Sequence, residues 1–428
     1  MIQKINAIKA VKGELTLPGD KSISHRAVMF SAMANGKSTV KNYLNSEDLN
    51  STIDCFRKLG CEIEQTETDL TITGKGFGGF SKPDTSLDAG NSGTTTRLIS
   101  GILAAQKFET KIIGDASLSK RPMKRIVDPL SQMGAKLETS ESGTLPIKIS
   151  NSEDLKAIEF DMKIASAQIK SAILLAGLHL EDETVVIEHS RTRNHTETLL
   201  GLKVEESDGY RKIYSSKKNY PKPTNYIVPS DISTSAFFIV LALILEGSEL
   251  LLKNVLLNDT RNGVIKILQQ MGGRIEIEDA RESSGEKLGD LRIFSSKLHN
   301  IELDKEIIPN IIDEIPILSV AGIFAEGKFS INNAKELRFK ESDRIAALCL
   351  NFTKLGLNCN EYEDGFELDG EIINENIQIE SFDDHRIAMA FAILGMLVDK
   401  GIRINNFESV AVSNPDFLNQ IKAISDNN

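Results

Sequence analysis

Apolar residues at helical spacing precede five similarly placed glycines along the chain. In two of these segments, Leu49, Ile53 and Phe56 share one predicted helix face, and Val264 and Leu268 share another. Alternating polar and apolar residues follow each glycine, in segments 59–64, 133–138, 200–205, 271–276 and 355–360. A glycine just past a last helical turn supplies the left-handed backbone that ends a helix, and the alternation is typical of a half-buried strand. The pattern predicts five helix–glycine–strand repeats, whose glycines are 74, 67, 71 and 84 residues apart.

A second, more apolar helix is predicted in each of the five repeats and once more near the C-terminus. Each of these helices follows a polar or glycine-rich start. The six starts are residues 19–22, 90–94, 166–168, 229–231, 309–313 and 383–386. Residues 387–398 are apolar nearly all round, which predicts a buried helix. We therefore expect six α/β units, the sixth ending in a helix at 415–424 without a further strand.

Six units exceed one comfortable core, so two domains of three units each are expected. Residues 217–228 contain two prolines and several lysines and are a plausible crossing point. The repeat alone would also suit a non-enzymatic solenoid scaffold, so periodicity does not assign a function.

Composition narrows the class of protein. A net charge of −11 argues against non-specific binding to nucleic acid or to an anionic membrane. The longest apolar stretches, 237–245 and 387–398, fall short of the roughly 20 residues that span a bilayer. Residues 1–19 lack the apolar region of a signal peptide, and the four cysteines show no C-x-x-C spacing. These features predict a soluble, cytoplasmic protein.

Candidate chemistry gathers at the predicted helix starts, whose unpaired N–H groups favour bound anions. Cationic and small polar residues stand there: Lys21, Ser22 and Arg26; Asn91, Gly93, Thr94 and Arg97; Ser166 and Gln168; His385 and Arg386. Further cations lie between helices, at 120–121, 191–193 and 338–344. If these starts converge, they form a cationic pocket that suits carboxylates and phosphates.

Metal chemistry is not indicated by the histidines or acids. The six histidines show no zinc-ligand spacing, and Asp383 and Asp384 beside Arg386 are expected to be structural partners. Of the histidines, His385 is the functional candidate, and His25 is expected to orient the first helix. We predict no metal site.

Five segments resemble signature segments of the 3-phosphoshikimate 1-carboxyvinyltransferase (EPSP synthase) family. They are residues 17–26, 88–97, 120–123, 340–344 and 384–386, and they stand in family order along the whole chain. The resemblance implies transfer of the carboxyvinyl group of phosphoenolpyruvate to the 5-hydroxyl of shikimate 3-phosphate, in aromatic amino-acid biosynthesis. It also implies release of phosphate through a tetrahedral intermediate, no cofactor, a monomer, small-molecule substrates as the only partners, and competition of glyphosate with phosphoenolpyruvate.

The fold that this resemblance implies is a two-domain inside-out α/β barrel. Each domain has three βαβαββ repeats, and the active site lies in the interdomain cleft. One domain is discontinuous, formed by residues 1–19 plus 229–428, and the other is inserted at 20–228.

The resemblance also implies site residues. Catalytic candidates are Asp313 as the base on the 5-hydroxyl, and Lys21, Glu341 and His385 in proton transfer or charge stabilisation. Candidates for binding shikimate 3-phosphate are Lys21, Ser22, Arg26, Ser166, Ala167, Gln168, Arg193, Asp313 and Lys340. Candidates for binding phosphoenolpyruvate are Lys21, Asn91, Gly93, Thr94, Arg121, Gln168, Arg344 and Arg386.

Some positions depart from the family pattern. A lysine that many members carry near the C-terminus is replaced by Val412 or Ala411. The segment 192–196 also differs, so either Arg191 or Arg193 could be the phosphate ligand. The related family that uses UDP-N-acetylglucosamine commonly has a cysteine in the loop at 114–121, where this chain has none. That activity and the scaffold are the alternative functions.

Overall fold

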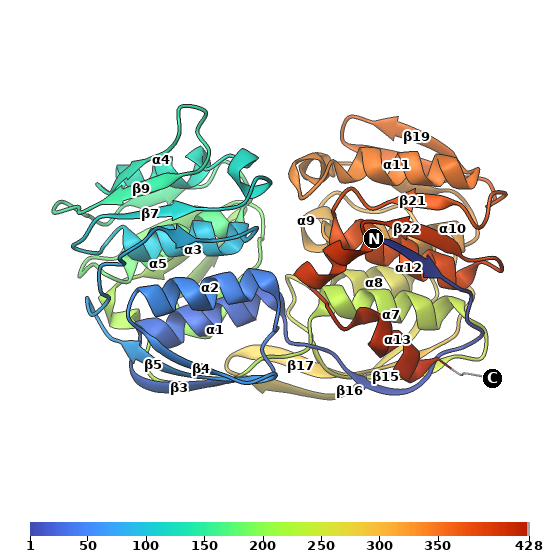
Figure 1. The fold of residues 1–428 in the computed structure, drawn as a ribbon, viewed down its shortest axis with the longest axis horizontal. Helices are drawn as coiled ribbons and strands as arrows, with labels where there is room; N and C mark the ends of the chain where they lie inside the picture. Colours follow the sequence, from blue (N-terminus) through green and yellow to red (C-terminus); the bar gives the residue numbers. More distant parts are fainter. Residues whose placement is uncertain (426–428) are drawn as a thin grey trace. The chain divides into compact units, whose positions relative to one another are not determined.

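The computed structural model describes residues 1–425, which divide into two compact units. Unit 1 comprises residues 1–18, 229–281 and 287–425, and unit 2 comprises 19–228 and 282–286. The chain thus passes from one unit to the other four times. Figure 1 draws both units.

Unit 2 contains three four-stranded sheets within residues 19–228, all of which are described. Their strand orders are β14-β3-β5-β4, β6-β7-β9-β8 and β10-β11-β13-β12. In each sheet the first two strands are parallel and the others antiparallel. The strands are β3 (Asn35–Lys41), β4 (Glu62–Gln65), β5 (Asp69–Lys75), β6 (Leu87–Asp88), β7 (Thr110–Ile113), β8 (Lys136–Glu138), β9 (Ile147–Ser150), β10 (Glu159–Asp161), β11 (Thr184–Glu188), β12 (Val204–Ser207), β13 (Tyr210–Ser215) and β14 (Asn225–Ile227).

Three helices form the interior of unit 2, namely α1 (Lys21–Met33), α3 (Gly93–Leu103) and α5 (Ala167–Gly177). Nearly all of their residues are buried, and α3 packs against both α1 and α5 (Figure 1). The other helices are amphipathic or short: α2 (Glu47–Lys58), α4 (Lys124–Gln132), α6 (His195–Leu200), and the 3₁₀ turns η1 (Leu118–Lys120) and η2 (Lys217–Asn219). Helices that are apolar on all sides must be covered on all sides, which explains sheets on the outside and helices within.

The described part of unit 1 repeats this plan with one four-stranded and two three-stranded sheets. Their strand orders are β16-β17-β15-β2, β18-β20-β19 and β1-β22-β21. The strands are β1 (Ile2–Ile5), β2 (Lys12–Thr16), β15 (Glu249–Leu256), β16 (Arg274–Ser283), β17 (Glu286–Phe294), β18 (Phe329–Ile331), β19 (Asn358–Tyr362), β20 (Gly365–Asp369), β21 (Gln378–Glu380) and β22 (Ile402–Asn405).

The buried helices of unit 1 are α7 (Ile232–Ile244), α10 (Ile315–Ile323) and α12 (His385–Leu397). They pack against one another in all three pairings, and each is buried over nearly its whole length. The remaining helices are α8 (Gly263–Gln270), α9 (Ile308–Ile311), α11 (Arg344–Leu355), α13 (Phe417–Ile424), η3 (Lys335–Phe339) and η4 (Phe407–Val412). Together with the sheets, these elements are the inside-out α/β fold that the sequence predicts.

The five repeat glycines have the backbone that the pattern predicts. Gly60, Gly134, Gly201, Gly272 and Gly356 have φ of +95°, +91°, +58°, +99° and +98°. Each follows a helix and precedes a strand, in the order α2–β4, α4–β8, α6–β12, α8–β16 and α11–β19. The helix–glycine–strand repeats are therefore confirmed.

Two details differ from the sequence expectations. Gly19 and residues 282–286, which are the turn between β16 and β17 with the adjoining strand ends, pack with unit 2 although the sequence places them in the other domain. The fifth polar start, 309–313, does not begin the buried helix: it forms most of α9, and α10 begins at Ile315. In residues 1–425, no helix combines the length and the apolar character needed to cross a membrane.

Candidate functional site

The first group of predicted site residues lies in unit 2, at the starts of its three buried helices. Side chains from the preceding residues cap these helices: Asp20 accepts from the Ile23 N–H at 2.9 Å, and Ser92 accepts from the Thr95 N–H at 3.1 Å. Ser166 caps α5 at 3.4 Å. Such caps fix where a helix begins, and hence where its first-turn side chains project. We call the polar residues at these three starts, with Arg121 and Arg193, the unit 2 cluster.

Gln168 joins two helices of the unit 2 cluster. Its amide oxygen accepts a hydrogen bond from Nη1 of Arg97 at 2.6 Å, and its amide nitrogen donates to Thr94 Oγ1 at 3.1 Å. Nearby, Arg121 Nη2 donates to Asn91 Oδ1 at 3.0 Å. Predicted binding residues on α3, α5 and the loop after η1 are thus held by hydrogen bonds to their neighbours.

Gly93 occupies a crowded position at the first residue of α3. A Cβ placed there would lie 2.8 Å from Nη1 of Arg97 and 3.5 Å from Nη1 of Arg121. Carbon atoms essentially never approach so closely, so any side chain at this position would displace Arg97. The glycine therefore keeps two guanidinium groups beside the helix start.

Arg26 lies inside the helix bundle and is 3% exposed. Its guanidinium donates to Thr196 Oγ1 and Ser171 Oγ, both at 2.8 Å, and to the Ser22 carbonyl at 3.0 Å. Burial lowers the pKa of Arg26 to about 10, against the opposing effect of Glu197 and other carboxylates. Arg26 is thus positioned by α1, α5 and α6 together.

Lys21 and His25, also on α1, have different surroundings. Lys21 is partly exposed and forms an ion pair with Asp48 at the start of α2. His25 is fully buried, and its Nδ1 is 2.7 Å from Thr52 Oγ1, which in turn is 2.6 Å from Thr95 Oγ1. Burial lowers the pKa of His25 to about 3, so its ring is neutral near pH 7. His25 thus connects α1 to α2 and, through Thr52, to α3.

A buried ion pair supports the loop that carries the two candidate phosphate ligands. Lys170 Nζ lies 3.0 Å from Glu188 and 2.7 Å from Glu197, and all three side chains are at most 3% exposed. Glu188 also accepts a hydrogen bond from the backbone N–H of Thr192. The carboxylate thereby ties the loop after β11 to helix α5.

Arg191 and Arg193, two positions apart in the loop after β11, differ in exposure. Arg191 is 58% exposed and pairs with Glu206 at 2.7 Å on the surface. Arg193 is half-buried and close enough to Arg26 for their charges to interact. Arg193 thus lies near Arg26 of the unit 2 cluster, whereas Arg191 pairs with Glu206 at the surface.

The second group of predicted site residues lies in unit 1, and we call it the unit 1 cluster. It is organised around Arg344 at the start of α11 and comprises Asp313, Lys340, Glu341, Arg344, Asp384, His385 and Arg386. The Nε and Nη2 atoms of Arg344 bind the two oxygens of Asp384 at 2.8 and 3.2 Å, and Nη2 also binds Glu341 at 2.6 Å. Burial alone would lower the pKa of Arg344, but Asp384, Glu341 and Asp313 outweigh it and raise the pKa above its usual value. Arg344 is 1% exposed and thus a fixed, permanently charged centre.

Asp313, the predicted base, faces three cations in the unit 1 cluster. Its carboxylate lies 3.2 Å from Arg344 Nη1, 3.7 Å from Lys340 Nζ and 3.9 Å from Arg386 Nη2. Arg386 Nη1 also donates to the Asp313 backbone carbonyl at 2.8 Å. Nearby positive charge favours an ionised carboxylate, which is the form that accepts a proton.

His385 and Asp384 start helix α12. Asp384 is fully buried and caps the helix by accepting from the Arg386 N–H at 2.9 Å, while His385 is 4% exposed. Asp384 also accepts from Ser342 Oγ at 3.0 Å, which ties α12 to the loop before α11. Asp384 is therefore a structural partner, as predicted, but its side chain pairs with Arg344. Val412, one of the two positions where the expected C-terminal lysine is replaced, is the last residue of η4.

Sequence reasoning missed three residues that support the unit 1 cluster. They are Glu314, Ser233 and Arg261, which are buried and contact one another. Glu314 directly follows Asp313, where the sequence is typical of a solvated helix start, and nothing in the sequence links it to Ser233 or Arg261. In unit 2, Asp48 was likewise missed as the partner of Lys21.

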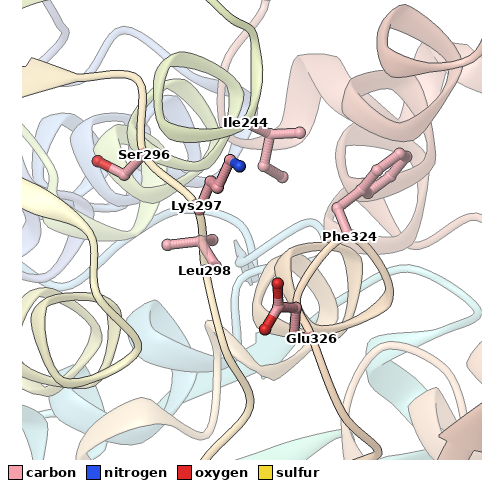
Figure 2. Close-up of a pocket in the computed structure, with 6 residues that line it drawn as sticks. All are labelled: Ile244, Ser296, Lys297, Leu298, Phe324 and Glu326. Atoms are coloured by element: carbon pink, nitrogen blue, oxygen red, sulfur yellow. The ribbon is translucent and has the colours of Figure 1, made fainter.

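A cavity in unit 1 is lined by residues other than those of the two clusters. Within residues 1–425, no group of three or more His, Cys, Asp or Glu side chains is arranged to hold a metal ion. A cavity of about 350 Å³ in unit 1 contains none of the predicted site residues in its lining. Figure 2 shows the side chains around it: Ile244, Ser296, Lys297, Leu298, Phe324 and Glu326.

Comparison with known proteins gives matches over the full length. The family model described as EPSP synthase (3-phosphoshikimate 1-carboxyvinyltransferase) matches residues 5–421. A protein of Alkaliphilus metalliredigens named 3-phosphoshikimate 1-carboxyvinyltransferase is 46% identical over 422 residues, covering 98% of this chain and 99% of its own. The structure of EPSP synthase from Acinetobacter baumannii is 42% identical, with a TM-score of 0.88 over 99% of this chain and 98% of that one.

A more distant structure shows how widely the fold is shared. The enolpyruvyl transferase NikO from Streptomyces tendae is only 13% identical but has a TM-score of 0.75, covering 99% of this chain and 97% of its own. That similarity concerns the fold alone. The family model and the curated relatives, in contrast, match in sequence over nearly every residue. The chain belongs to the EPSP synthase (3-phosphoshikimate 1-carboxyvinyltransferase) family.

Proposed function

We propose that the protein transfers the carboxyvinyl group of phosphoenolpyruvate to the 5-hydroxyl of shikimate 3-phosphate and releases phosphate. Membership of the family carries this proposal, because the match covers residues 5–421 and includes all five signature segments. The cationic residues of both clusters suit the chemistry, since the two substrates together present two phosphates and two carboxylates. Anions of this kind repel one another unless positive groups hold them.

Asp313 is proposed as the base. It accepts the proton of the 5-hydroxyl while that oxygen attacks C2 of phosphoenolpyruvate, and an acid delivers a proton to C3. The tetrahedral intermediate then loses phosphate from C2 and a proton from C3, which restores the double bond. Lys340, 3.7 Å from Asp313, is proposed to bind shikimate 3-phosphate beside the base.

Lys21 and Glu341 are the proposed acids, and His385 is proposed to stabilise charge. Lys21 is 24% and Glu341 26% exposed in its side chain, so neither is sealed in the core. Each already contacts an oppositely charged residue, Asp48 for Lys21 and Arg344 for Glu341. Such a contact holds an acid in one orientation until substrate binds.

Most of the proposed binding residues are assigned to one of the two substrates, and two are assigned to both. Arg121, Asn91, Gly93 and Thr94, with Arg344 and Arg386, are proposed for phosphoenolpyruvate. Ser22, Arg26, Ser166, Ala167 and Arg193 are proposed for shikimate 3-phosphate, and Gln168 and Lys21 for both. The observation that supports the role of Gln168 is its pair of hydrogen bonds, to Arg97 on one side and Thr94 on the other.

We further propose a monomeric, cytoplasmic enzyme, as the family resemblance implies. Light scattering of the purified protein tests the monomer: a mass near 47.1 kDa supports it, and twice that mass contradicts it.

Phosphate release tests the proposed reaction. The purified chain is incubated with phosphoenolpyruvate and either shikimate 3-phosphate or UDP-N-acetylglucosamine, in buffer containing a chelator. Release with shikimate 3-phosphate alone is expected. Release only with the sugar nucleotide, or with neither acceptor, contradicts the proposal.

A further inference from the structure

Glu314, the residue that follows the proposed base Asp313 in the sequence, has a buried carboxylate. Its side chain is 0% exposed, although it stands beside Asp313 in a polar segment that precedes α10. An isolated buried charge is costly unless neighbouring groups compensate it. The role of Glu314 can therefore be inferred from the groups that contact its carboxylate.

Three side chains from three different elements surround the Glu314 carboxylate. Ser233, in the first turn of α7, donates a hydrogen bond to Oε1. Arg386 Nη1 lies 3.6 Å from the same oxygen, and Arg261 Nη2 lies 4.0 Å from it. Arg261 is 2% exposed and also donates to Ser233 Oγ at 2.6 Å. One carboxylate thus stands close to two guanidinium groups.

Arg386 links this buried group to the proposed base. The Nη1 atom that faces Glu314 also donates to the Asp313 carbonyl at 2.8 Å, and Nη2 lies 3.9 Å from the Asp313 carboxylate. The Arg386 guanidinium is therefore held between the backbone and carboxylate of Asp313 and the carboxylate of Glu314. A shift of this guanidinium would move a proposed phosphoenolpyruvate ligand and a contact of the base together.

We propose that Glu314 is a positioning residue that fixes Arg386 for phosphoenolpyruvate, with Ser233 and Arg261 holding the Glu314 carboxylate in turn. This inference rests on the proposed function. Glu314 does not touch substrate: it acts through the guanidinium of Arg386. Its negative charge also offsets Arg261, whose buried positive charge would otherwise repel Arg386.

Glu314→Gln separates charge from shape. Glutamine has nearly the same volume and keeps an oxygen that can accept from Ser233, but it removes the charge that faces Arg386 and Arg261. Because the charge that faces Arg386 is lost, we expect KM for phosphoenolpyruvate to rise roughly tenfold. KM for shikimate 3-phosphate should change less than about twofold, because its proposed ligands are other residues.

Three further variants make the measurement decisive. Glu306→Gln, an exposed carboxylate on the same segment, is the matched control and should behave as the wild type. Glu314→Asp keeps the charge with a shorter side chain and should recover part of the lost affinity for phosphoenolpyruvate. Ser233→Ala removes the hydroxyl donor alone, and it provides the test if Glu314→Gln does not fold: it should raise KM for phosphoenolpyruvate selectively.

The experiment measures initial rates of phosphate release for all variants, with circular dichroism and thermal unfolding as checks on folding. A selective rise in KM for phosphoenolpyruvate in folded Glu314→Gln or, failing that, in Ser233→Ala, supports the proposal. Equal rises for both substrates, a loss of kcat alone, or unchanged kinetics overturns it while leaving the proposed reaction intact. An inactive wild-type enzyme overturns the proposed function and this inference together.

Discussion

Gln168 and Arg97 hold two buried helices of unit 2 together at their starts. The amide oxygen of Gln168 accepts a hydrogen bond from Arg97 Nη1 at 2.6 Å, across 71 residues of sequence. The same Nη1 atom would lie 2.8 Å from a Cβ at position 93. Gly93, Arg97 and Gln168 therefore lie next to one another, and a substitution at one of them should displace the side chains of the others.

Gly93→Ala tests this relationship. The methyl group must push Arg97 away and thereby loosen Gln168, so KM for phosphoenolpyruvate should rise on the order of ten- to a hundredfold, as expected for misplaced binding groups. Initial-rate kinetics at saturating shikimate 3-phosphate give the value. An unchanged KM would remove Gly93 from the proposed site. In the wild type, glyphosate should compete with phosphoenolpyruvate, as the family resemblance implies.

Asp313→Asn tests the base. The amide cannot accept the hydroxyl proton, so kcat should fall by about 10²–10⁴-fold, the usual contribution of general base catalysis. Binding of shikimate 3-phosphate, measured by calorimetry, should remain because its other proposed ligands, among them Lys340, Arg26 and Arg193, stay in place. Turnover within about tenfold of the wild type would exclude Asp313 as the base.

Arg193 and Arg191 form a matched pair for the phosphate ligand. Arg193→Ala should raise KM for shikimate 3-phosphate at least tenfold, because a hydrogen bond to a charged group contributes about 1.5–3 kcal/mol. Arg191 binds Glu206 on the surface, so Arg191→Ala should change KM less than about twofold. The opposite ranking in the same kinetic assay would assign the phosphate to Arg191.

Much of the fold follows from the sequence because its signals are local. The glycines at 60 and 356 end helices in a left-handed conformation that a single residue type determines. Buried helices such as α12 are apolar on every side, which a linear pattern shows directly. The signature segments likewise carry the candidate residues in short stretches, so their identity needs no tertiary information.

The supporting partners of the site could not be predicted because they depend on contacts across the chain. Glu314 beside Asp313 is typical of a solvated helix start, yet Ser233, 81 residues away, donates to it in the core. Arg344 pairs with Asp384 at a separation of 40 residues. Side chains that meet only after folding leave no periodic pattern in the sequence.

Glu188→Ala probes the buried support of the Arg193 loop. Removing one partner of a buried ion pair leaves Lys170 less compensated and frees the Thr192 N–H, so the free energy of unfolding should fall by about 3–5 kcal/mol. Arg191→Ala, which breaks the exposed pair with Glu206, should cost no more than about 1 kcal/mol. Urea unfolding gives both values, and equal losses would contradict the role given to Glu188.

Because the ring of His25 is buried and neutral, the folded protein should lose stability in mild acid. The pKa of His25 is about 3 in the folded protein and about 6.5 when unfolded, so below pH 6.5 the unfolded chain binds a proton that the folded chain does not. Stability contributed by the neutral ring is present above pH 6.5 and falls as the pH drops towards 3, by about 2 kcal/mol at pH 5.

His25→Gln should therefore flatten the dependence of stability on pH between 6.5 and 4.5, measured by urea unfolding. His299→Gln, at an exposed histidine, is the control and should keep the wild-type slope. An unchanged slope in His25→Gln would show that His25 is not the titrating group.

The central claim, that this chain builds an enol ether on shikimate 3-phosphate, is tested most directly by identifying the product. The wild-type protein is incubated with phosphoenolpyruvate and shikimate 3-phosphate, and the mixture is followed by proton and phosphorus NMR. We expect vinyl protons of a carboxyvinyl ether at the 5-oxygen, appearing in step with an equal amount of inorganic phosphate. Phosphate without the ether, or an ether only when UDP-N-acetylglucosamine replaces shikimate 3-phosphate, would contradict it.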